Sequence, residues 1–242
     1  MSSEQAFLQN YDPAQFDRPS LSVDLVIFTI NDDQLQILLV KRIEHPAKGR
    51  WALPGGFIDI HRDATLEDCA RRKLLEKTGV KAPYLEQLKS YGSQDRDPRG
   101  WVATAVYFAL LASDTVNLGG NQEDVCWWPI KGDTVDVELA FDHNQIVTDA
   151  VERLRSKLEY THIAVHLLAS EFTLPELQKT YEVILQQQLD KSSFRRRVMD
   201  AEMLEEIKGK LREGIGRPAQ LYRFKHYERR TFFPRSISRY AK

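Results

Sequence analysis

The chain has 242 residues, 42% of them hydrophobic and 10% aromatic, which is enough for one large domain or two modest ones and excludes disorder over the whole length. No apolar run approaches the roughly 20 residues that a membrane-spanning helix needs. The first twenty residues are polar, unlike a secretory signal. Two cysteines, Cys69 and Cys126, are too few for a disulfide framework. We therefore expect a cytoplasmic protein that has no contact with a membrane.

The net charge of −1 hides an uneven distribution along the chain. Residues 151–242 hold 19 Lys and Arg against 12 Asp and Glu, whereas residues 1–150 hold 15 against 23. This division favours an acidic module followed by one that meets a polyanion, although two merely solvated halves would show the same counts.

The first half of the chain predicts strands on both sides of one helix. Two β-rich runs over 21–30 and 34–42 flank the turn-forming residues Asn31-Asp32-Asp33, which favours an antiparallel hairpin. Helical spacing then runs from Thr65 to Thr78, with Gly79 as the C-cap. Strand-like stretches follow at 84–91, 101–111 and 124–129. This order indicates an α+β fold rather than an alternating parallel sheet.

From about residue 144 the pattern becomes helical. Apolar residues recur at three- and four-residue steps over 144–158, which predicts a long amphipathic helix that could be a connector, a dimer element, or both. A short apolar helix is predicted at 161–169. The next helix starts at Thr173, with Pro175 in its first turn and Glu176 completing a capping box. We divide the chain into a domain over 1–143, a linker helix over 144–160 and a domain over 161–242.

The segment GGFIDIHRDATLEDCARRKLLEKTGV, residues 55–80, resembles the Nudix box, whose pattern is G-x5-E-x7-R-E-U-x-E-E-x-G-U with U aliphatic. Aligned from its end, the pattern matches at Arg72, Leu74, Glu76, Gly79 and Val80. LLVKR and WALPGGF precede the box where the Nudix family places them, so the resemblance covers roughly residues 20–140. It implies that the first domain is an α/β/α sandwich.

The box departs from the family pattern where Nudix hydrolases hold Mg²⁺. Lys73 and Lys77 stand at two of the three glutamate positions on one helix face, and the loop before the helix carries two extra residues. Because Mg²⁺ needs anionic oxygen ligands, we expect no metal site and no catalytic residues, with the ligand pocket retained. A simple scaffold whose helix is salt-bridged through Arg72 and Glu76 is one alternative, and residual hydrolysis is another.

A second stretch, SQDRDPRGW at 93–101, places Arg96 and Arg99 in a turn. Guanidinium groups bind phosphate or carboxylate with two parallel hydrogen bonds. In Nudix proteins that act on ADP-ribose, a similar Arg-Asp-Pro-Arg segment lies by the substrate; an ordinary charged turn is the alternative. Trp51 and Trp101 either stack on an adenine or belong to the core.

The second half predicts a winged helix-turn-helix domain, because a helix, a break at 189–191, a helix over 192–200 and a turn and strand at 215–224 follow in that order. On a helical wheel Phe194 and Val198 define the buried side, which leaves Arg196 almost opposite. The residues around it are Ser192, Ser193, Arg195 and Arg197. Such a basic, hydroxyl-bearing face suits the DNA major groove, and a small helical domain with a solvated basic face is the alternative.

The expected wing carries further positive charge. Arg217 lies in a Gly-Arg-Pro turn, where it could reach phosphate or the minor groove. The other basic residues of this region are Lys208, Lys210, Arg212, Arg229, Arg230, Arg235 and Arg239.

Phe194-Arg195-Arg196-Arg197 and Gly216-Arg217-Pro218-Ala219 are similar to the second half of one family, the Nudix-related transcriptional regulators of NAD metabolism in bacteria. This resemblance covers nearly the whole chain. It implies a homodimeric repressor that binds a palindromic operator in double-stranded DNA and is released by ADP-ribose, or a related NAD derivative, in the Nudix pocket. It also implies a location in the bacterial cytoplasm, on the nucleoid when bound to DNA.

We therefore expect the ligand to contact Arg42, Trp51, Gly55, Gly56, Arg72, Glu76, Arg96 and Arg99, with no Mg²⁺ or other cofactor required. We expect DNA to contact Lys191, Ser192, Ser193, Arg195, Arg196, Arg197 and Arg217. The rival functions are a Nudix hydrolase of ADP-ribose with an accessory C-terminal domain and a nucleic-acid-processing factor.

Overall fold

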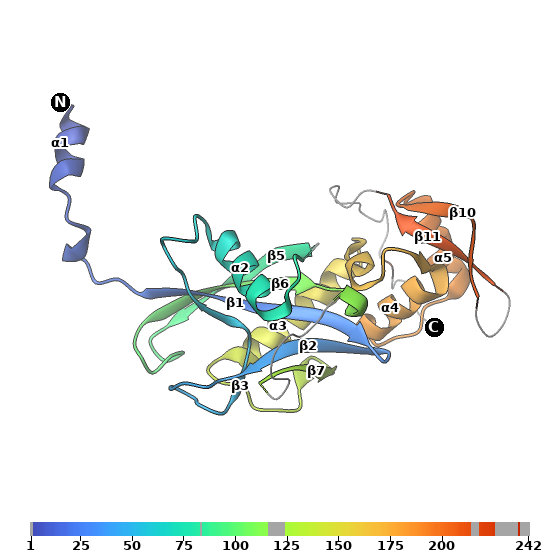
Figure 1. Cartoon of the computed structure of the whole chain (residues 1–242), viewed down its shortest axis with the longest axis horizontal. Helices are drawn as coiled ribbons and strands as arrows, with labels where there is room; N and C mark the ends of the chain where they lie inside the picture. Colours follow the sequence, from blue (N-terminus) through green and yellow to red (C-terminus); the bar gives the residue numbers. More distant parts are fainter. Residues whose placement is uncertain (1, 83, 116–123, 214–217, 226–236, 238–242) are drawn as a thin grey trace.

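The computed structural model describes residues 2–82, 84–115, 124–213, 218–225 and 237. In this part of the chain eight strands form a large mixed sheet and three form a small one (Figure 1). The strands of the large sheet are β1 (Ser20–Asn31), β2 (Gln34–Lys41), β3 (Trp51–Ala52), β4 (Gly55–Phe57), β5 (Tyr84–Ser93), β6 (Val102–Leu110), β7 (Val125–Lys131) and β8 (Thr134–Val135). No helix of the described residues is both long and apolar enough to cross a membrane.

The large sheet has the strand order β5-β6-β1-β2-β7-β8, with β3 paired to β2 and β4 paired to β1. β1 and β6 run parallel, from Ser20 opposite Val102 to Phe28 opposite Leu110. The other pairs in this sheet are antiparallel. The predicted hairpin is confirmed, since Asp32 and Asp33 connect β1 to β2 with φ of 49° and 57°, as a tight hairpin turn requires.

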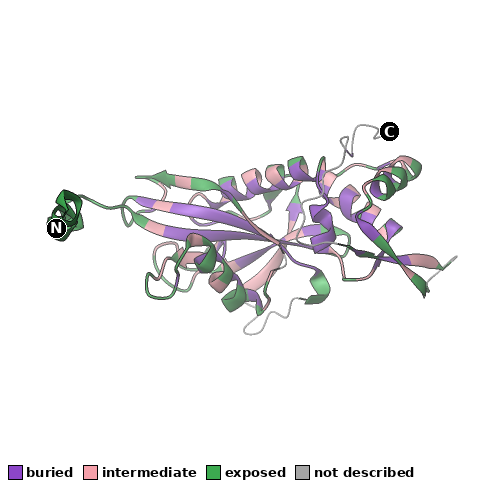
Figure 2. Cartoon of the chain, turned by 90° about the horizontal axis from the view of Figure 1, so that it is seen from above, coloured by how far each residue is buried: buried purple, intermediate pink, exposed green. Residues whose placement is uncertain are grey.

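Two helices, α2 (Leu66–Thr78) and α3 (His143–Leu158), cover opposite faces of the large sheet. Val23, Leu25 and Ile27 of β1 pack in one cluster with buried residues of α2, whereas Val26 and Phe28 pack in another with those of α3. A strand covered on both faces is apolar along its length rather than alternating, and the middle of the sheet is accordingly buried in Figure 2. The α/β/α sandwich that the Nudix resemblance implied is therefore confirmed.

The ends of α2 follow the predicted signals. Thr65 is the N-cap, and its hydroxyl accepts a hydrogen bond from the Asp68 amide in a capping box. Gly79 ends the helix with φ of 70°, and its amide donates to the Leu75 carbonyl at 2.9 Å. A left-handed residue is a common helix ending and favours glycine.

The C-terminal unit is a winged helix. Its elements are a 3-10 turn η3 (Ile163–Leu167), β9 (Phe172–Thr173), α4 (Leu174–Leu185), α5 (Lys191–Asp200), β10 (Leu204–Arg212) and β11 (Ala219–Phe224), with sheet order β10-β11-β9. The predicted capping box of α4 is confirmed, because the Thr173 hydroxyl accepts from the Glu176 amide and the Glu176 carboxylate accepts from the Thr173 amide. The segment predicted as a short helix at 161–169 forms only η3, because its apolar residues are buried on all sides rather than along one stripe.

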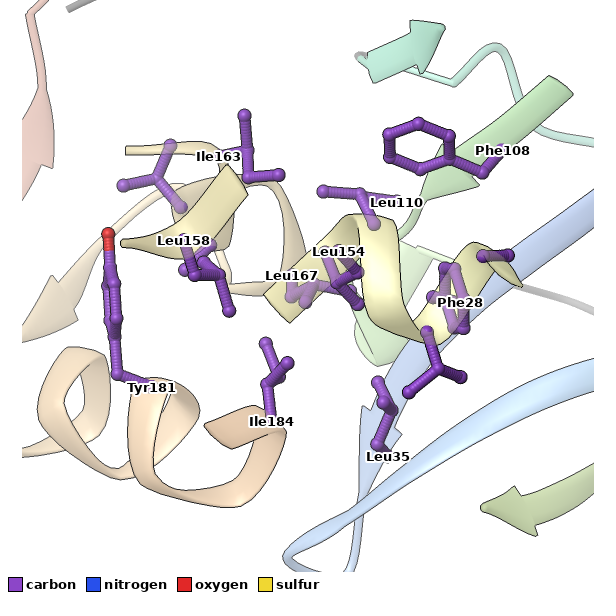
Figure 3. Close-up of a cluster of buried hydrophobic side chains, with 14 of the residues drawn as sticks. Phe28, Leu35, Phe108, Leu110, Leu154, Leu158, Ile163, Leu167, Tyr181 and Ile184 are labelled. Carbon is purple, nitrogen blue, oxygen red and sulfur yellow. The ribbon is translucent and has the colours of Figure 1, made fainter. Parts of the chain in front are cut away.

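The core of the two units is continuous through α3. Leu154 and Leu158 of α3 pack in one cluster with Phe28 of the sheet and with Tyr181 and Ile184 of α4 (Figure 3). Polar contacts reinforce this packing: the Arg155 guanidinium donates to the carbonyls of Ile184 and Gly132 at 2.8 and 2.5 Å. The apolar side of α3 is thus used inside the chain, as the connector alternative predicts.

The N-terminal segment lies apart from both units. It contains helix α1 (Ser3–Asn10) and a 3-10 turn η1 (Pro13–Gln15), and none of the residues in either is buried. Figures 1 and 2 both show α1 standing away from the sheet at the end of an extended connection. Another short 3-10 turn, η2 (Ser113–Thr115), follows β6.

Candidate functional site

A cavity of about 140 Å³ lies where β1, β2 and β4 meet the 96–99 turn and the beginning of α3. Five of the eight predicted ligand residues line it: Arg42, Gly55, Gly56, Arg96 and Arg99. Sequence reasoning missed Asp24, Phe57, Asp97, Phe141 and His143, which also line it. Phe57 belongs to the WALPGGF motif and could have been found there. Asp97 lies in the predicted 96–99 segment itself, whereas Asp24, Phe141 and His143 come from segments distant in sequence that only the fold brings to this cavity.

The two glycines shape the floor of the cavity for different reasons. A Cβ at Gly55 would lie 2.1 Å from Asp24 Oδ1 and 2.6 Å from the Val23 carbonyl, so β4 can approach β1 only with glycine at this position. Gly56 has φ of 150°, a conformation that other residues rarely adopt. The Pro-Gly-Gly break thus sets the backbone that faces the ligand cavity.

Positive charge accumulates in the cavity. Arg42 stacks on the Phe141 ring, with its guanidinium carbon 4.8 Å from the ring centroid, and Arg99 stacks on Phe57 at 4.9 Å. Burial and the nearby Arg99 guanidinium lower the pKa of Arg42. Arg99 also pairs with Asp97 at 2.7 Å, and its guanidinium holds the pKa of that carboxyl below the usual value. Two guanidiniums beside aromatic rings make a site suited to an anion that carries a flat ring.

Arg96 is held more tightly than the other two arginines. Its Nε and Nη2 donate to the two Asp142 carboxylate oxygens, both at 2.9 Å, and its side chain is only 6% exposed. Asp142 directly precedes α3, so this pair joins the cavity to the first turn of that helix. The next residue, His143, is buried, and its Nδ1 accepts a hydrogen bond from the Leu53 amide at 2.9 Å. Burial lowers the pKa of His143, which favours the neutral ring.

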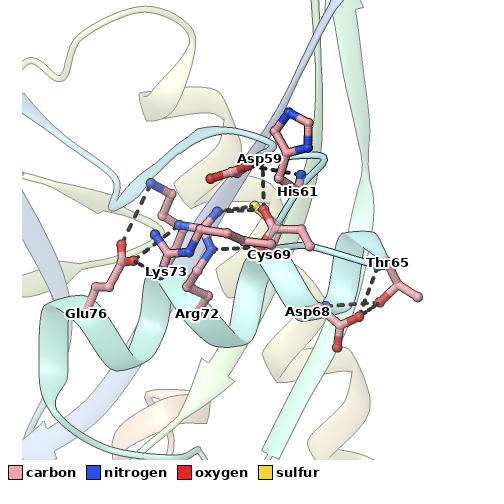
Figure 4. Close-up of polar contacts among 10 residues, drawn as sticks. Asp59, His61, Thr65, Asp68, Cys69, Arg72, Lys73 and Glu76 are labelled. Carbon is pink, nitrogen blue, oxygen red and sulfur yellow. Dashed lines mark hydrogen bonds and ion pairs between the residues drawn. The ribbon is translucent and has the colours of Figure 1, made fainter.

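Trp51, Arg72 and Glu76, the other three predicted ligand residues, do not line the cavity, and each has a partner elsewhere. Trp51 packs edge-on against Trp128 with centroids 5.5 Å apart. Arg72 donates to both Asp63 oxygens at 2.7 and 2.6 Å and to Glu76 at 3.2 Å (Figure 4). Trp101 is half exposed and packs on Gly92, so it too lies outside the cavity.

The residues of the box do not fit a magnesium ion. The Lys73 ammonium lies against Gly56, 3.3 Å from where a Cβ would be, and Lys77 lines the cavity. Asp63 is bound by Arg72, which holds its pKa well below the usual range, and Glu76 pairs with Arg72 and Lys73. Among the described residues no three His, Cys, Asp or Glu side chains form a group that could hold a metal ion. Cations occupy the place where the Nudix pattern calls for carboxylates.

The exposed side of α5 is basic, as the helical wheel predicts. Phe194 is 3% exposed and Val198 is fully buried, and they fix the rotation of the helix against α4. The Asp190 carboxylate caps the helix by accepting from the Ser193 amide at 2.9 Å. Lys191, Ser192, Arg195 and Arg196 are exposed, whereas Ser193 is partly buried. Lys191 and Arg195 also line a groove of about 410 Å³ between α5, the start of α4 and β11.

Two of the arginines predicted to contact DNA, Arg197 and Arg217, are not on the exposed face of α5. Arg197 turns inward and donates a hydrogen bond to the Ile237 carbonyl, so we leave it out of the candidate DNA surface. Arg217 lies outside the described residues, as do Arg229, Arg230, Arg235 and Arg239. On β10, Lys210 pairs with Glu171 and Arg212 with Glu176, whereas Lys208 lies on an exposed stretch of the strand.

A sandwich with an altered Nudix box, followed by a winged helix with a basic helix face, defines a class: a winged-helix regulator that carries a NUDIX domain. Two family models match the chain, the NUDIX domain over residues 21–148 and the NrtR DNA-binding winged helix domain over residues 164–224. The chain is 44% identical over 236 residues to the "ADPR responsive transcriptional repressor NtrR" of Acinetobacter baylyi, covering 98% of this chain and 94% of that protein. The chain belongs to the NrtR family of transcriptional regulators.

Solved structures of a relative agree with this assignment. The crystal structure of Shewanella oneidensis NrtR complexed with a 27mer DNA matches with a TM-score of 0.84 and 44% identity, covering 90% of this chain and 99% of that one. The NUDIX domain of the same protein, crystallised with ADP ribose, matches with a TM-score of 0.57 and 46% identity over 64% of this chain and 99% of that one.

Proposed function

We propose that the protein is a transcriptional repressor of NAD-metabolism genes that binds double-stranded DNA through α5 and responds to ADP-ribose in the NUDIX cavity. The observation that carries this proposal is the exposed face of α5, where Arg195 and Arg196 point away from buried Phe194 and Val198. The complexes of the Shewanella relative with DNA and with ADP ribose support both parts of the proposal.

The cavity suits ADP-ribose by its chemistry. Arg42 and Arg99 offer charge-assisted hydrogen bonds to the pyrophosphate, and the rings of Phe57 and Phe141 offer faces for the adenine. Sites for such ligands usually measure about 300–1,000 Å³, so entry requires the Arg99 side chain, which lies across the two rings, to move aside. ADP-ribose would then replace the repulsion between neighbouring guanidiniums with pairing to its phosphates.

We also propose that the NUDIX domain is inactive as a hydrolase and needs no Mg²⁺ for binding. Lys73 and Lys77 bring positive charge to the place where the metal would bind and so repel it, which leaves no metal ion to activate the attacking water. An assay for AMP released from ADP-ribose in the presence of Mg²⁺ should give only background. Turnover of about 1 s⁻¹, near the low end for enzymes, would contradict this part of the proposal.

In this proposal, helix α3 couples ligand binding in the cavity to DNA binding by the winged helix. Its first turn meets the cavity through the Asp142–Arg96 pair, and near its other end Arg155 binds the α4 carbonyl of Ile184. An anion that draws Arg96 away from Asp142 would release the start of α3, and the rigid helix would carry this change to the winged helix. ADP-ribose would act by favouring one of two positions of α3.

The protein would act in the bacterial cytoplasm as a homodimer on a palindromic operator, because a two-fold operator needs two reading heads related by a two-fold axis. The test is selection of bound DNA from a random pool, repeated with and without ADP-ribose. We expect an inverted repeat to be enriched and its recovery to fall when ADP-ribose is added. No enrichment by a folded protein would refute DNA recognition, and enrichment that ADP-ribose leaves unchanged would refute sensing.

A further inference from the structure

The N-terminal arm, residues 2–19, exposes four large apolar side chains. The exposed fractions are 63% for Phe7, 62% for Leu8, 44% for Tyr11 and 59% for Phe16. Tyr11, the residue that ends α1, lies four residues after Phe7 and three after Leu8, so the three side chains lie near one another, and the ring centroids of Phe7 and Tyr11 are 5.6 Å apart. A capping box at Ser2 and Gln5 starts the helix. An eight-residue helix is marginal alone in water, so its stability requires a surface to pack on.

A groove of about 370 Å³ on the outside of α2 offers such a surface. Its floor is apolar, formed by Leu74, Leu75, Ala82 and Leu85 between α2 and the start of β5. Leu75 is 43% exposed, although its neighbour Leu74 is buried. This groove is separate from the ligand cavity, which opens near the beginning of α3.

The charges of the arm and the groove are opposite. Residues 2–19 carry Glu4, Asp12 and Asp17 against a single Arg18. Arg71, Arg72 and Lys81 line the groove. Arg72 already pairs with Asp63. Arg71 makes only an exposed pair with Glu67 on its own helix, and a carboxylate of the arm can replace Glu67 with little loss of free energy. The same negative charge makes DNA an unsuitable partner for the arm.

The arm leaves its own chain at the end of the sheet away from the groove. It joins β1 at Ser20, which pairs with Val102 at the beginning of β6, whereas Tyr84, beside the groove, pairs with Leu110 at the end of β6. These ends are about 26 Å apart at the usual rise along a strand. The arm also points outward from the sheet rather than back over α2 (Figures 1 and 2). This direction favours the groove of a neighbouring molecule over its own.

We propose that the N-terminal arm packs into the α2 groove of a second copy of this chain, with Phe7 and Leu8 on the apolar floor and the acidic residues toward Arg71 and Lys81. A reciprocal exchange would bury two arms around a two-fold axis. The inference rests on the homodimer of the proposed function and adds the contact that holds it together.

The first test compares sedimentation of the full chain with a Phe7→Ser, Leu8→Ser double variant and with Leu75→Glu. We expect dimerisation to weaken at least about tenfold in both, as loss of a central apolar anchor does. Ile60→Ser is the matched control, because Ile60 is 79% exposed and lies outside both surfaces. The thermal unfolding of the double variant should match the parent, because α1 has no buried residue. Unchanged dimerisation in the arm and groove variants would overturn the inference.

The second test identifies which copy the arm binds. Phe7→Cys and Leu75→Cys are placed on two differently tagged chains, both with Cys126→Ser, and a disulfide between the chains is expected on mild oxidation. Ile60→Cys in place of Leu75→Cys should give none. A stable dimer without the disulfide, or a disulfide within one chain that carries both cysteines, would overturn the arm exchange while leaving the dimer intact. A parent chain that is monomeric at micromolar concentration would overturn both the arm exchange and the dimer of the proposed function.

Discussion

Whether an arginine side chain can bind a ligand depends on whether a nearby carboxylate already pairs with its guanidinium group. Arg72 matches the Nudix pattern but is taken up by Asp63, nine residues earlier, and Arg96 is taken up by Asp142, 46 residues later. Arg42 and Arg99 keep part of their surface toward the cavity. The motifs LLVKR, WALPGGF and SQDRDPRGW contain all five glycine and arginine positions that line the cavity. The sequence could not assign their partners, because pairs such as Arg96–Asp142 form only when the sheet brings distant turns together.

Replacing Arg99 tests the ligand site. Arg99→Ala removes one cationic donor from the cavity, and we expect ADP-ribose to bind about 10- to 100-fold more weakly, because a hydrogen bond to a charged group contributes about 1.5–3 kcal/mol. Arg99→Lys should recover only part of the loss, because an ammonium cannot donate two parallel hydrogen bonds. Calorimetry gives the affinity, and Arg50→Ala, which removes a surface pair with Glu138, is the control. Equal affinity in the Arg99 variants would exclude that side chain from the site.

Replacing Arg196 tests the reading face of α5. If this side chain binds a guanine edge, Arg196→Ala should cost about 1–3 kcal/mol in DNA binding and relax the preference at one base pair. A contact with phosphate alone would instead weaken all sequences alike and make the salt dependence shallower. Gel shifts over several salt concentrations separate the two, with exposed Lys131→Ala as the control. Full affinity in folded Arg196→Ala would show that another element enters the groove.

At the scale of elements, local signals predicted the helices well because their ends are chemically marked. Thr65, Gly79, Thr173 and Glu176 all act as the capping pattern predicts. The segment at 161–169 was harder to assign, since an apolar run buried on every side has no periodicity that separates an α-helix from a 3-10 turn. The packing partners of α3 could not be predicted, because an amphipathic stripe indicates that one side of a helix is buried but not which elements bury it.

Asp142 is the residue that tests the coupling role of α3. Asp142→Asn weakens its pair with Arg96 but keeps the size of the side chain, so the cavity and the helix can still form. We expect ADP-ribose to bind as well as before or better, because its competitor for Arg96 is weaker. The ratio of the DNA dissociation constants measured with and without ADP-ribose should shrink. A ratio equal to that of the parent would place the coupling outside this contact.

At the scale of the whole molecule, the sequence predicted two kinds of domain and a linker helix between them, but not which side chains pack across the junction. The two domains are joined by the packing of α3 between the sheet and α4. They also meet where η3 contacts the start of β5, with the ring centroids of His166 and Tyr84 5.1 Å apart. None of these contacts follows from a motif. They arise from apolar side chains that either domain alone would leave exposed.

This junction predicts acid sensitivity. Burial, with a smaller effect of neighbouring His162, lowers the pKa of His166 from 6.5 to about 4. Between these values the unfolded chain takes up a proton that the folded chain excludes, so the free energy of unfolding falls as pH drops from about 6.5 to about 4, by up to about 3 kcal/mol. Buried His143 adds an effect of the same sign. Urea unfolding at several pH values should show a shallower decline for His166→Phe; an unchanged slope would contradict the assignment.

The shared core also governs what fragments of this protein can do. Tyr181 and Ile184 of the winged helix are fully buried in a cluster whose other side is supplied by α3 and the sheet. A chain that began after α3 would expose these side chains to water and lose the packing that orders α4, and with it the support of α5. Proteolysis or an internal start of translation would therefore not release a winged helix that binds DNA without the NUDIX domain. We expect such a fragment to lose DNA binding together with its fold, so that DNA binding stays tied to the presence of the NUDIX domain.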